Sequence, residues 1–248
     1  MRLDVYLTEN GLCRSRSAAQ SLIKNGGVTV NGKPAARNSL EIAETDMVEI
    51  SGTKLPKYVG RGGQKLERAL GLWGIDLGGK TCLDIGSSTG GFTDCMLQNG
   101  AARVFAVDVG RDQLAEKLRA DSRVISLEQT DIRDFTFEKY GVSAADFIGT
   151  DVSFISLKLV LPHMYGLLAE EGTAVALIKP QFEVGRKNLS KRGIVRDEKT
   201  RLKCVEEVKS FAERCGFTVL GTAVSPITGG DGNAEYLLAL KKSEGERQ

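Results

Sequence analysis

Histidine and long apolar stretches are the scarcest features of this 248-residue chain. His163 is the only histidine, so we expect neither a histidine-based catalytic triad nor a multi-histidine metal site. No uninterrupted apolar run approaches the roughly 18 residues that a membrane-spanning helix needs. The first six residues, Met1-Arg-Leu-Asp-Val-Tyr6, lack the apolar core and cleavage site of a signal peptide. We therefore expect a cytoplasmic protein with no membrane partner.

Disulfides are not expected either. The five cysteines, at positions 13, 82, 95, 204 and 215, form no CxxC pair, and any pairing would leave one over. Such cysteines are typical of reduced, mostly buried thiols. Hydrophobic residues make up 41% of the chain and charged residues 27%, as in ordinary globular proteins. The length allows one large domain, or a small domain joined to a larger one.

Acidic residues are missing from positions 11–40, although cations are common there. The cations are Arg14, Arg16, Lys24, Lys33 and Arg37. The net charge of the chain is only +2, so the local distribution is what matters. A stretch of one sign would present a cationic face to phosphates. A basic surface that is merely solvated is the alternative.

The same segment has the pattern of a compact domain over residues 1–51. Helical spacing predicts one helix over residues 2–10 and a second helix capped by Ser15 or Ser17. Asn31-Gly32 predicts a hairpin, and residues 47–50 a further strand. The residues expected to face inward are Leu3, Tyr6, Leu7, Ala18, Leu22 and Ile23.

Residues 52–60 have the composition of a linker, and a helix is expected to begin at Arg61. After Gly79, short apolar strands alternate with helices. We expect strands near 81–85, 104–108, 123–127, 146–151 and 173–179, and helices near 91–99, 112–120, 156–168 and 197–215. Two final strands, at 217–225 and 235–241, leave no room for a helix between them. The order predicts an α/β fold: a doubly wound, Rossmann-like parallel sheet of about seven strands, with its last strand antiparallel and at the edge.

A loop of small residues follows the first of these strands, in Asp84-Ile-Gly-Ser-Ser-Thr-Gly-Gly-Phe92. Residues with little side chain let a ligand approach the backbone closely. The G-x-G-x-x-G fingerprint of dinucleotide folds fails at Ser88, which disfavours a nicotinamide-dependent oxidoreductase. An acid before the loop suits a ligand with a cationic amino-acid end, as in S-adenosylmethionine. The alternative is an ordinary tight turn between strand and helix.

Asp108 ends the next strand, where an acid commonly accepts hydrogen bonds from the hydroxyl groups of a bound ribose. The cofactor residues predicted from these patterns are Asp84, Gly86, Ser87, Ser88, Thr89, Gly90, Gly91, Phe92, Asp108 and Asp131.

The front of the chain resembles an S4 RNA-binding domain. The resemblance rests on Arg2-Leu-Asp4, Ser15-Arg-Ser-Ala-Ala19 and the run from Lys24 through Val28-Thr-Val-Asn-Gly-Lys33. It implies that two helices and the following hairpin grip structured RNA. Arg14, Arg16, Lys24 and Lys33 would then contact phosphates.

Four further residues, Lys65, Asp151, Lys179 and Glu235, resemble the K-D-K-E tetrad of FtsJ-type ribose 2′-O-methyltransferases. With an S4 domain in front, the whole chain resembles the TlyA family of hemolysin-like ribosomal RNA cytidine-2′-O-methyltransferases. The likeness covers about residues 2–241 and implies S-adenosylmethionine as cofactor, ribosomal RNA or ribosomal subunits as partner, and no metal. Lys179, poised by Asp151, would activate the ribose hydroxyl. Lys65 and Glu235 would hold the nucleotide and the lysine.

A basic stretch, residues 184–203, lies between the fifth and sixth expected strands. Its first part has loop composition and predicts a second segment that clamps RNA, with a solvated loop as the alternative. The RNA-binding residues predicted overall are Arg2, Arg14, Arg16, Lys24, Lys33, Arg61, Arg186, Lys187, Lys191 and Arg192.

The expected domains are an S4-like unit at 1–51, a linker at 52–60, a methyltransferase domain at 61–242 and a frayed tail at 243–248. Two other functions remain open at this point. The chain could be a non-catalytic RNA-binding or ribosome-assembly factor, or a membrane-active hemolysin. Neither explains the intact tetrad, and no apolar or amphipathic membrane segment supports the second.

Overall fold

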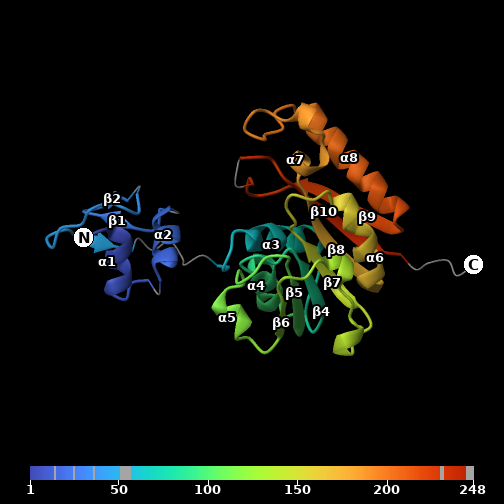
Figure 1. The fold of residues 1–248 in the computed structure, drawn as a ribbon, viewed down its shortest axis with the longest axis horizontal. Coiled ribbons are helices and arrows are strands. Elements are labelled where there is room, and N and C mark those ends of the chain that lie inside the picture. The colour runs from blue at the N-terminus through green and yellow to red at the C-terminus, as the bar shows by residue number, and fades with distance from the viewer. Residues whose placement is uncertain (14, 25, 36, 51–56, 230–231, 244–248) are drawn as a thin grey trace, which may run out of the picture. The chain divides into compact units, whose positions relative to one another are not determined.

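The computed structural model describes residues 1–13, 15–24, 26–35, 37–50, 57–229 and 232–243 (Figure 1). The chain divides into two compact units, Met1–Lys57 and Tyr58–Gln248. Residues 51–56 lie outside the described residues, and 52–56 of them belong to the expected linker.

The first unit contains two helices and a small sheet. The elements are α1 (Leu3–Glu9), α2 (Arg16–Lys24), β1 (Thr29–Val30), β2 (Lys33–Pro34) and β3 (Val48–Glu49), and the strand order is β2-β1-β3. Asn31 and Gly32 both have positive φ, at 52° and 74°, as a tight two-residue hairpin requires. The ααβ pattern expected here is therefore present.

One core position of this unit differs from expectation. Ala19, not Ala18, is fully buried, together with Leu22 and Ile23. The Ser15 hydroxyl accepts a hydrogen bond from the Ala18 backbone N–H at 3.2 Å, so Ser15 is the capping residue and Ala18 lies in the first turn. Positions i, i+3 and i+4 of a helix share one face, which explains why Ala19 joins the other two.

The second unit is built on a seven-stranded sheet of order β6-β5-β4-β7-β8-β10-β9. The strands are β4 (Thr81–Ile85), β5 (Arg103–Val107), β6 (Val124–Leu127), β7 (Ala145–Thr150), β8 (Leu168–Ile178), β9 (Phe217–Val224) and β10 (Tyr236–Lys242). The first five run parallel, and β10 is antiparallel to both of its neighbours. The predicted α/β fold with an antiparallel last strand is confirmed. The expectation that this strand lies at the edge is wrong, because β9 forms the edge and β10 enters between β8 and β9.

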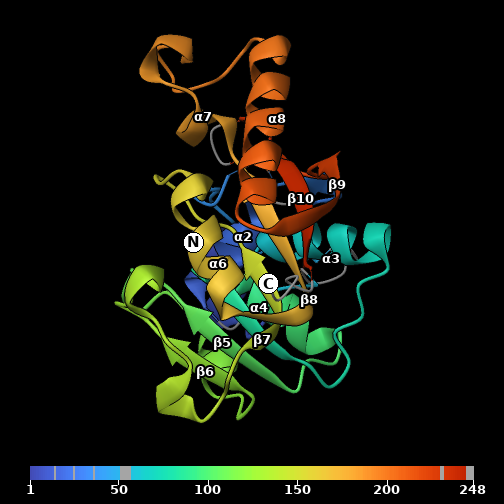
Figure 2. The ribbon, with the colours of Figure 1, turned by 90° about the vertical axis from the view of Figure 1, so that its right-hand side faces the viewer.

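Helices cover both faces of the sheet (Figure 2). One buried cluster joins the sheet to α3 (Gly62–Trp73), α4 (Gly91–Gln98) and α5 (Glu116–Arg119). The other cluster joins it to α6 (Leu161–Leu167) and α8 (Glu198–Arg214). The remaining short helices are α7 (Pro180–Glu183), η1 (Ile132–Asp134), η2 (Glu138–Tyr140), η3 (Leu157–Leu159) and η4 (Arg186–Asn188).

Two helices are shorter than expected. The helix expected over 112–120 covers only Glu116–Arg119, because the backbone N–H groups of Asp112, Gln113 and Leu114 donate to the Glu128 carboxylate instead. The helix expected over 156–168 begins as the η3 turn, and its last expected residue already belongs to β8.

All five cysteines are free thiols. Burial raises the pKa of Cys82 and of Cys204 to about 12, so both stay protonated. Among the described residues, no helix is long and apolar enough to cross a membrane.

Candidate active site

The loop between β4 and α4 has a backbone that only small residues allow. Gly86 and Gly90 have φ of 81° and 94°, and Ser88 has φ of 47°. A Cβ atom on Gly90 would lie 2.2 Å from a methyl carbon of Leu118, and one on Gly86 would lie 3.0 Å from the Asp151 carbonyl oxygen. Glycine is therefore required at both positions by conformation and by space.

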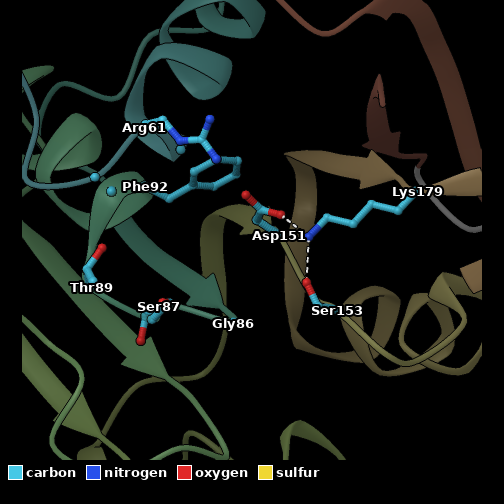
Figure 3. A pocket seen from close by; sticks show the side chains of 12 residues that line it. Arg61, Gly86, Ser87, Thr89, Phe92, Asp151, Ser153 and Lys179 are labelled. Atoms are coloured by element: carbon cyan, nitrogen blue, oxygen red, sulfur yellow. Dashed lines mark hydrogen bonds and ion pairs between the residues drawn. The ribbon is translucent and has the colours of Figure 1, made fainter. Parts of the chain in front are cut away.

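This loop forms one wall of a pocket of about 200 Å³ at the carboxyl ends of the strands (Figure 3). Such a position is where open α/β sheets bind ligands. The pocket is lined by Gly60, Arg61, Gly62, Gly86, Ser87, Ser88, Thr89, Gly91, Phe92, Asp151, Ser153 and Lys179. Six of the predicted cofactor residues belong to this lining, namely Gly86, Ser87, Ser88, Thr89, Gly91 and Phe92.

The start of α3 closes the pocket by close backbone packing. A Cβ on Gly60 would lie 2.7 Å from Thr89 Oγ1, and one on Gly91 would lie 3.0 Å from the Gly63 backbone nitrogen. Arg61, predicted to contact RNA, is exposed and lines this pocket. Gly60 and Gly62 also line the pocket, although neither was predicted as a site residue. Their signal was the Gly60-Arg-Gly-Gly63 run itself.

Asp84 lies behind the loop and does not line the pocket. Its Oδ2 accepts hydrogen bonds from the Thr93 backbone N–H at 2.9 Å and from the Thr93 hydroxyl at 2.6 Å. Burial raises the pKa of Asp84 to about 7, against the opposing effect of these hydrogen bonds. The carboxyl group therefore holds the first turn of α4 in place.

Asp108 and Asp131 also lie outside the pocket lining. Asp108 accepts hydrogen bonds from the backbone N–H groups of Ser88 and Gly110, both at 2.7 Å, so it joins the glycine loop to the end of β5. Asp131 forms an ion pair with Arg133 at 2.6 Å. The hydrogen bond from Arg133 lowers the pKa of Asp131 to about 2.

The four tetrad side chains come together although they are far apart in the sequence. Lys65 Nζ lies 3.1 Å from Asp151 Oδ2 and 2.7 Å from Glu235 Oε2. Lys179 Nζ lies 2.6 Å from Asp151 Oδ1. Sheet register explains part of this convergence, since Tyr236 pairs with Ile178 and the preceding Glu235 is thus level with Lys179.

The tetrad is largely shielded from solvent. Lys65, Lys179 and Glu235 are exposed by only 7%, 8% and 3%. Burial alone would raise the pKa of Asp151, but the positive charges of Lys179 and Lys65 outweigh it and lower that pKa. Asp151 is consequently an anion that bridges two lysines. The described residues contain no group of three or more His, Cys, Asp or Glu side chains that could hold a metal ion.

Two residues beside the tetrad were not predicted from the sequence. Ser153 Oγ accepts a hydrogen bond from Lys179 Nζ at 2.8 Å. Phe154 follows with φ of 64°, is 91% exposed, and lies 5.1 Å from the Phe182 ring, measured between centroids. A bulky residue with positive φ is a conformational outlier of the kind that collects at functional sites. Backbone strain of this kind has no signal in the sequence.

In the first unit, the predicted RNA contacts Arg2 and Arg16 are organised by Asp4. This carboxylate is fully buried and pairs with both arginines, at 3.0 and 3.2 Å, and with the Gln20 amide at 2.9 Å. Arg2 and Lys24 also line a second pocket, with Arg37, Asn38 and Ser39. Lys33 is exposed. Arg14 lies outside the described residues.

The predicted clamp segment is anchored at one point near the tetrad. Arg186, Lys187, Lys191 and Arg192 are all exposed. The buried amide of Asn233 donates to the Gly193 carbonyl and accepts from the Val195 N–H, both at 3.1 Å. Because Asn233 precedes Glu235 by two residues, the basic segment is tied to the stretch that leads into β10 and carries this tetrad residue.

Comparison with known families agrees with this geometry. Residues 58–242 match the family described as FtsJ-like methyltransferase, and residues 1–48 match the S4 domain. The chain belongs to the FtsJ-like methyltransferase family. The match covers the glycine loop and all four tetrad positions.

Relatives share both domains with this FtsJ-like chain. YqxC of Bacillus subtilis is 46% identical, and the alignment covers 96% of this chain and 85% of YqxC. The 16S/23S rRNA (cytidine-2'-O)-methyltransferase TlyA of Mycobacterium tuberculosis is 41% identical, with coverage of 97% and 89%. A solved structure of a protein named as a hemolysin, from Streptococcus thermophilus, is 43% identical with a TM-score of 0.77. The match covers 98% of this chain and 89% of that one.

Proposed function

We propose that this protein transfers a methyl group from S-adenosylmethionine to the 2′-hydroxyl of a ribose, in a cytidine of ribosomal RNA. The observation that carries the proposal is the convergence of Lys65, Asp151, Lys179 and Glu235 beside the glycine-loop pocket. The activity named for the Mycobacterium tuberculosis relative supports the cytidine and the ribosomal RNA. A ribosomal substrate supports a cytoplasmic location for the enzyme.

The pocket suits S-adenosylmethionine in several respects. The loop from Gly86 to Gly91 offers a close approach to the backbone, and Arg61 supplies a cation for a carboxylate. The N-terminus of α3 also faces the pocket, through Gly62, and favours an anion. Asp108 would accept hydrogen bonds from the ribose hydroxyls, and Asp131 would contact the nucleoside part of the cofactor. Asp84 would act indirectly, by holding Thr93 at the start of α4. Bound there, S-adenosylmethionine would supply a methyl group already activated by the positive charge on sulfur.

The tetrad would prepare the acceptor. A ribose hydroxyl is a weak nucleophile, so the enzyme must align it and help remove its proton. Lys179 orients the hydroxyl and either takes its proton or stabilises the negative charge that develops on oxygen. Asp151 holds Lys179, and its other oxygen holds Lys65. Glu235 is the second carboxylate partner of Lys65 and so completes the chain of ion pairs that ends at Lys179.

RNA binding would use both basic regions. The exposed cations of the S4 unit and of residues 186–192 suit contacts to phosphate oxygens. The exposed Phe154 ring, three residues after Asp151, suits stacking against a nucleobase. Cations for the RNA backbone, and an exposed aromatic ring on the loop that carries Asp151 and Ser153, are together suited to an RNA substrate.

Substitution of Lys179 tests the proposal directly. Lys179→Ala should lower methylation of ribosomes by about 10²- to 10⁴-fold, the usual contribution of a proton-transfer group. Fold and RNA affinity should be nearly unchanged, because Asp151 keeps Lys65 as its ion partner. The measurement is transfer of a labelled methyl group to ribosomal subunits from a strain that lacks the enzyme, followed by mapping of the modified ribose. The exposed Lys139→Ala variant is the control.

Two results would refute the assignment. Turnover retained in Lys179→Ala would remove Lys179 from the mechanism. A label found on a base, or on protein, would refute ribose methylation whatever the behaviour of the variants.

A further inference from the structure

The Lys179 ammonium is held at two points. Asp151 Oδ1 lies 2.6 Å from Nζ, and Ser153 Oγ lies 2.8 Å from it on the same loop (Figure 3). In the part of the chain that the structure describes, these are the ion-pair and hydrogen-bond partners of Lys179. A lysine has a flexible four-carbon stem and three N–H directions, so two anchors restrict where the third points.

The two anchors differ in what they accept. A carboxylate can only accept, and it therefore favours the charged ammonium. A hydroxyl oxygen accepts from a lysine N–H but carries no charge, so it favours the ammonium less than a carboxylate does. A neutral amine keeps two N–H groups, so Ser153 Oγ can accept from Lys179 in either protonation state.

The loop that carries Ser153 is fixed on both sides of it. Before it, Asp151 bridges Lys65 and Lys179. After it, the Glu183 carboxylate accepts hydrogen bonds from the Ser156 hydroxyl at 2.7 Å and the Leu157 N–H at 2.6 Å. Ser153 therefore does not need its bond to Lys179 to keep the loop in place.

From these contacts we infer that Ser153 is a positioning residue for Lys179, which directs the amine at the acceptor hydroxyl and stays bonded as the proton moves. The inference rests on the proposed function for its chemical meaning. In the step itself, the ribose oxygen forms a bond to the methyl carbon while the carbon–sulfur bond breaks and its electron pair stays on sulfur. The hydroxyl proton passes to Lys179 in its neutral form. Ser153 Oγ accepts a hydrogen bond from a Lys179 N–H throughout, as it does in the structure, which leaves the lone pair of the neutral amine free to take the proton.

Kinetics of three variants test the inference. Ser153→Ala should lower kcat on the order of 10- to 100-fold, as expected when a hydrogen bond to a charged group is lost. The KM for ribosomal subunits and the Kd for S-adenosylmethionine should stay near wild type. Ser153→Thr keeps the hydroxyl and should recover most of kcat. Ser143→Ala, which removes an exposed hydroxyl outside the pocket, should leave kcat near wild type.

A wild-type kcat in Ser153→Ala would overturn the inference. So would a rise in KM at unchanged kcat, which would make Ser153 a substrate contact, or a Ser153→Thr variant as slow as Ser153→Ala. Nitrogen-15 NMR of the lysine ammonium groups gives a readout without turnover. The signal that disappears in Lys179→Ala identifies Lys179. That signal should be sharp in wild type and in Ser153→Thr, and broadened or lost in Ser153→Ala.

The two proposals fail in different ways. If Ser153→Ala leaves the Lys179 signal unchanged, the positioning role is refuted even if the enzyme methylates ribosomal RNA. If the signal changes as expected but no ribosomal RNA is methylated, the proposed substrate falls and the role of Ser153 toward Lys179 stands.

Discussion

Two carboxyl groups near the ends of neighbouring strands, Asp84 and Asp151, are affected by burial in opposite directions. Burial raises the pKa of Asp84 to about 7, because its hydrogen bonds from Thr93 do not compensate for lost hydration. Burial acts on Asp151 as well, but two lysine charges outweigh it and lower the pKa. The two groups differ because only Asp151 has lysines beside it. Asp84 therefore supports the loop through hydrogen bonds, whereas Asp151 is an anion that holds two lysines.

The raised pKa of Asp84 predicts a pH-dependent cost to stability. Between about pH 4 and pH 7 the folded protein keeps a proton on Asp84 that the unfolded chain has lost, so stability falls as pH rises through this window. Asp84→Asn removes this titration. The free energy of unfolding of the variant, relative to wild type, should therefore increase by about 2–3 kcal/mol from pH 5 to pH 8. Denaturant titrations at both pH values measure it.

Asp121→Asn is the matched control for this effect. A hydrogen bond from Arg123 lowers the pKa of Asp121, so its contribution to stability is lost only as pH falls below the unfolded value. The difference between this variant and wild type should be constant from pH 5 to pH 8. Parallel stability curves for wild type and Asp84→Asn would contradict the prediction.

At the scale of elements, the start of α3 decides whether the pocket can form. Gly62 lines the pocket, and Lys65 projects from the next turn into the tetrad. The helix can lie this close because Gly63 leaves space for the Tyr58 ring. A Cβ on Gly63 would lie 2.3 Å from a ring carbon of Tyr58.

Two glycines of α3 provide a matched comparison. Gly63→Ala should destabilise the protein by about 1–3 kcal/mol, since overpacking forces the Tyr58 ring or the helix to move. It should also weaken S-adenosylmethionine binding, because the displaced helix carries one wall of the pocket. Gly71→Ala in the same helix meets no atom within 4 Å and should stabilise the protein by about 0.5–1 kcal/mol. Thermal unfolding and calorimetric titration measure both effects, and equal behaviour of the two variants would contradict this account.

At the scale of the whole molecule, the basic regions occur in both compact units. Arg2, Arg16, Lys24 and Lys33 belong to the first unit, and residues 186–192 to the second. An RNA that contacts both would gain affinity from the link between the units. Because phosphate contacts release counterions, that affinity should be strongly salt-dependent.

Charge reversal in the second basic region tests this expectation. The double variant Lys191→Glu/Arg192→Glu should weaken binding of ribosomal RNA and reduce the slope of log affinity against log salt by about 1–2, roughly one per lost phosphate contact. The control is Arg103→Glu/Lys139→Glu, which changes the net charge equally at exposed positions outside the pocket and both basic regions. Equal losses in the two double variants would mean that net charge alone matters, and a flat salt dependence in wild type would refute phosphate contacts.

Much of the fold was predictable because its signals are local. The spacing of apolar residues over short windows indicates which segments are strands and which are helices. The small residues of 86–91 indicate a turn that lets a ligand approach the backbone. The features that were predicted wrongly depend on contacts between residues distant along the chain. Helix α5 is short because three backbone N–H groups before it donate to the Glu128 carboxylate. Strand β10 lies inside the sheet because it pairs with both β8 and β9.

The sequence by itself determined the fold class, the glycine loop and, through the family pattern, the four residues of the tetrad. Only the tertiary structure decided what surrounds them. It made Asp151 a bridge between two lysines, kept Asp84 behind the loop, and brought Ser153 to Lys179. The physical reason is that residue types follow from local pattern and spacing. Protonation, hydrogen-bond partners and strain depend on neighbours that are distant along the chain.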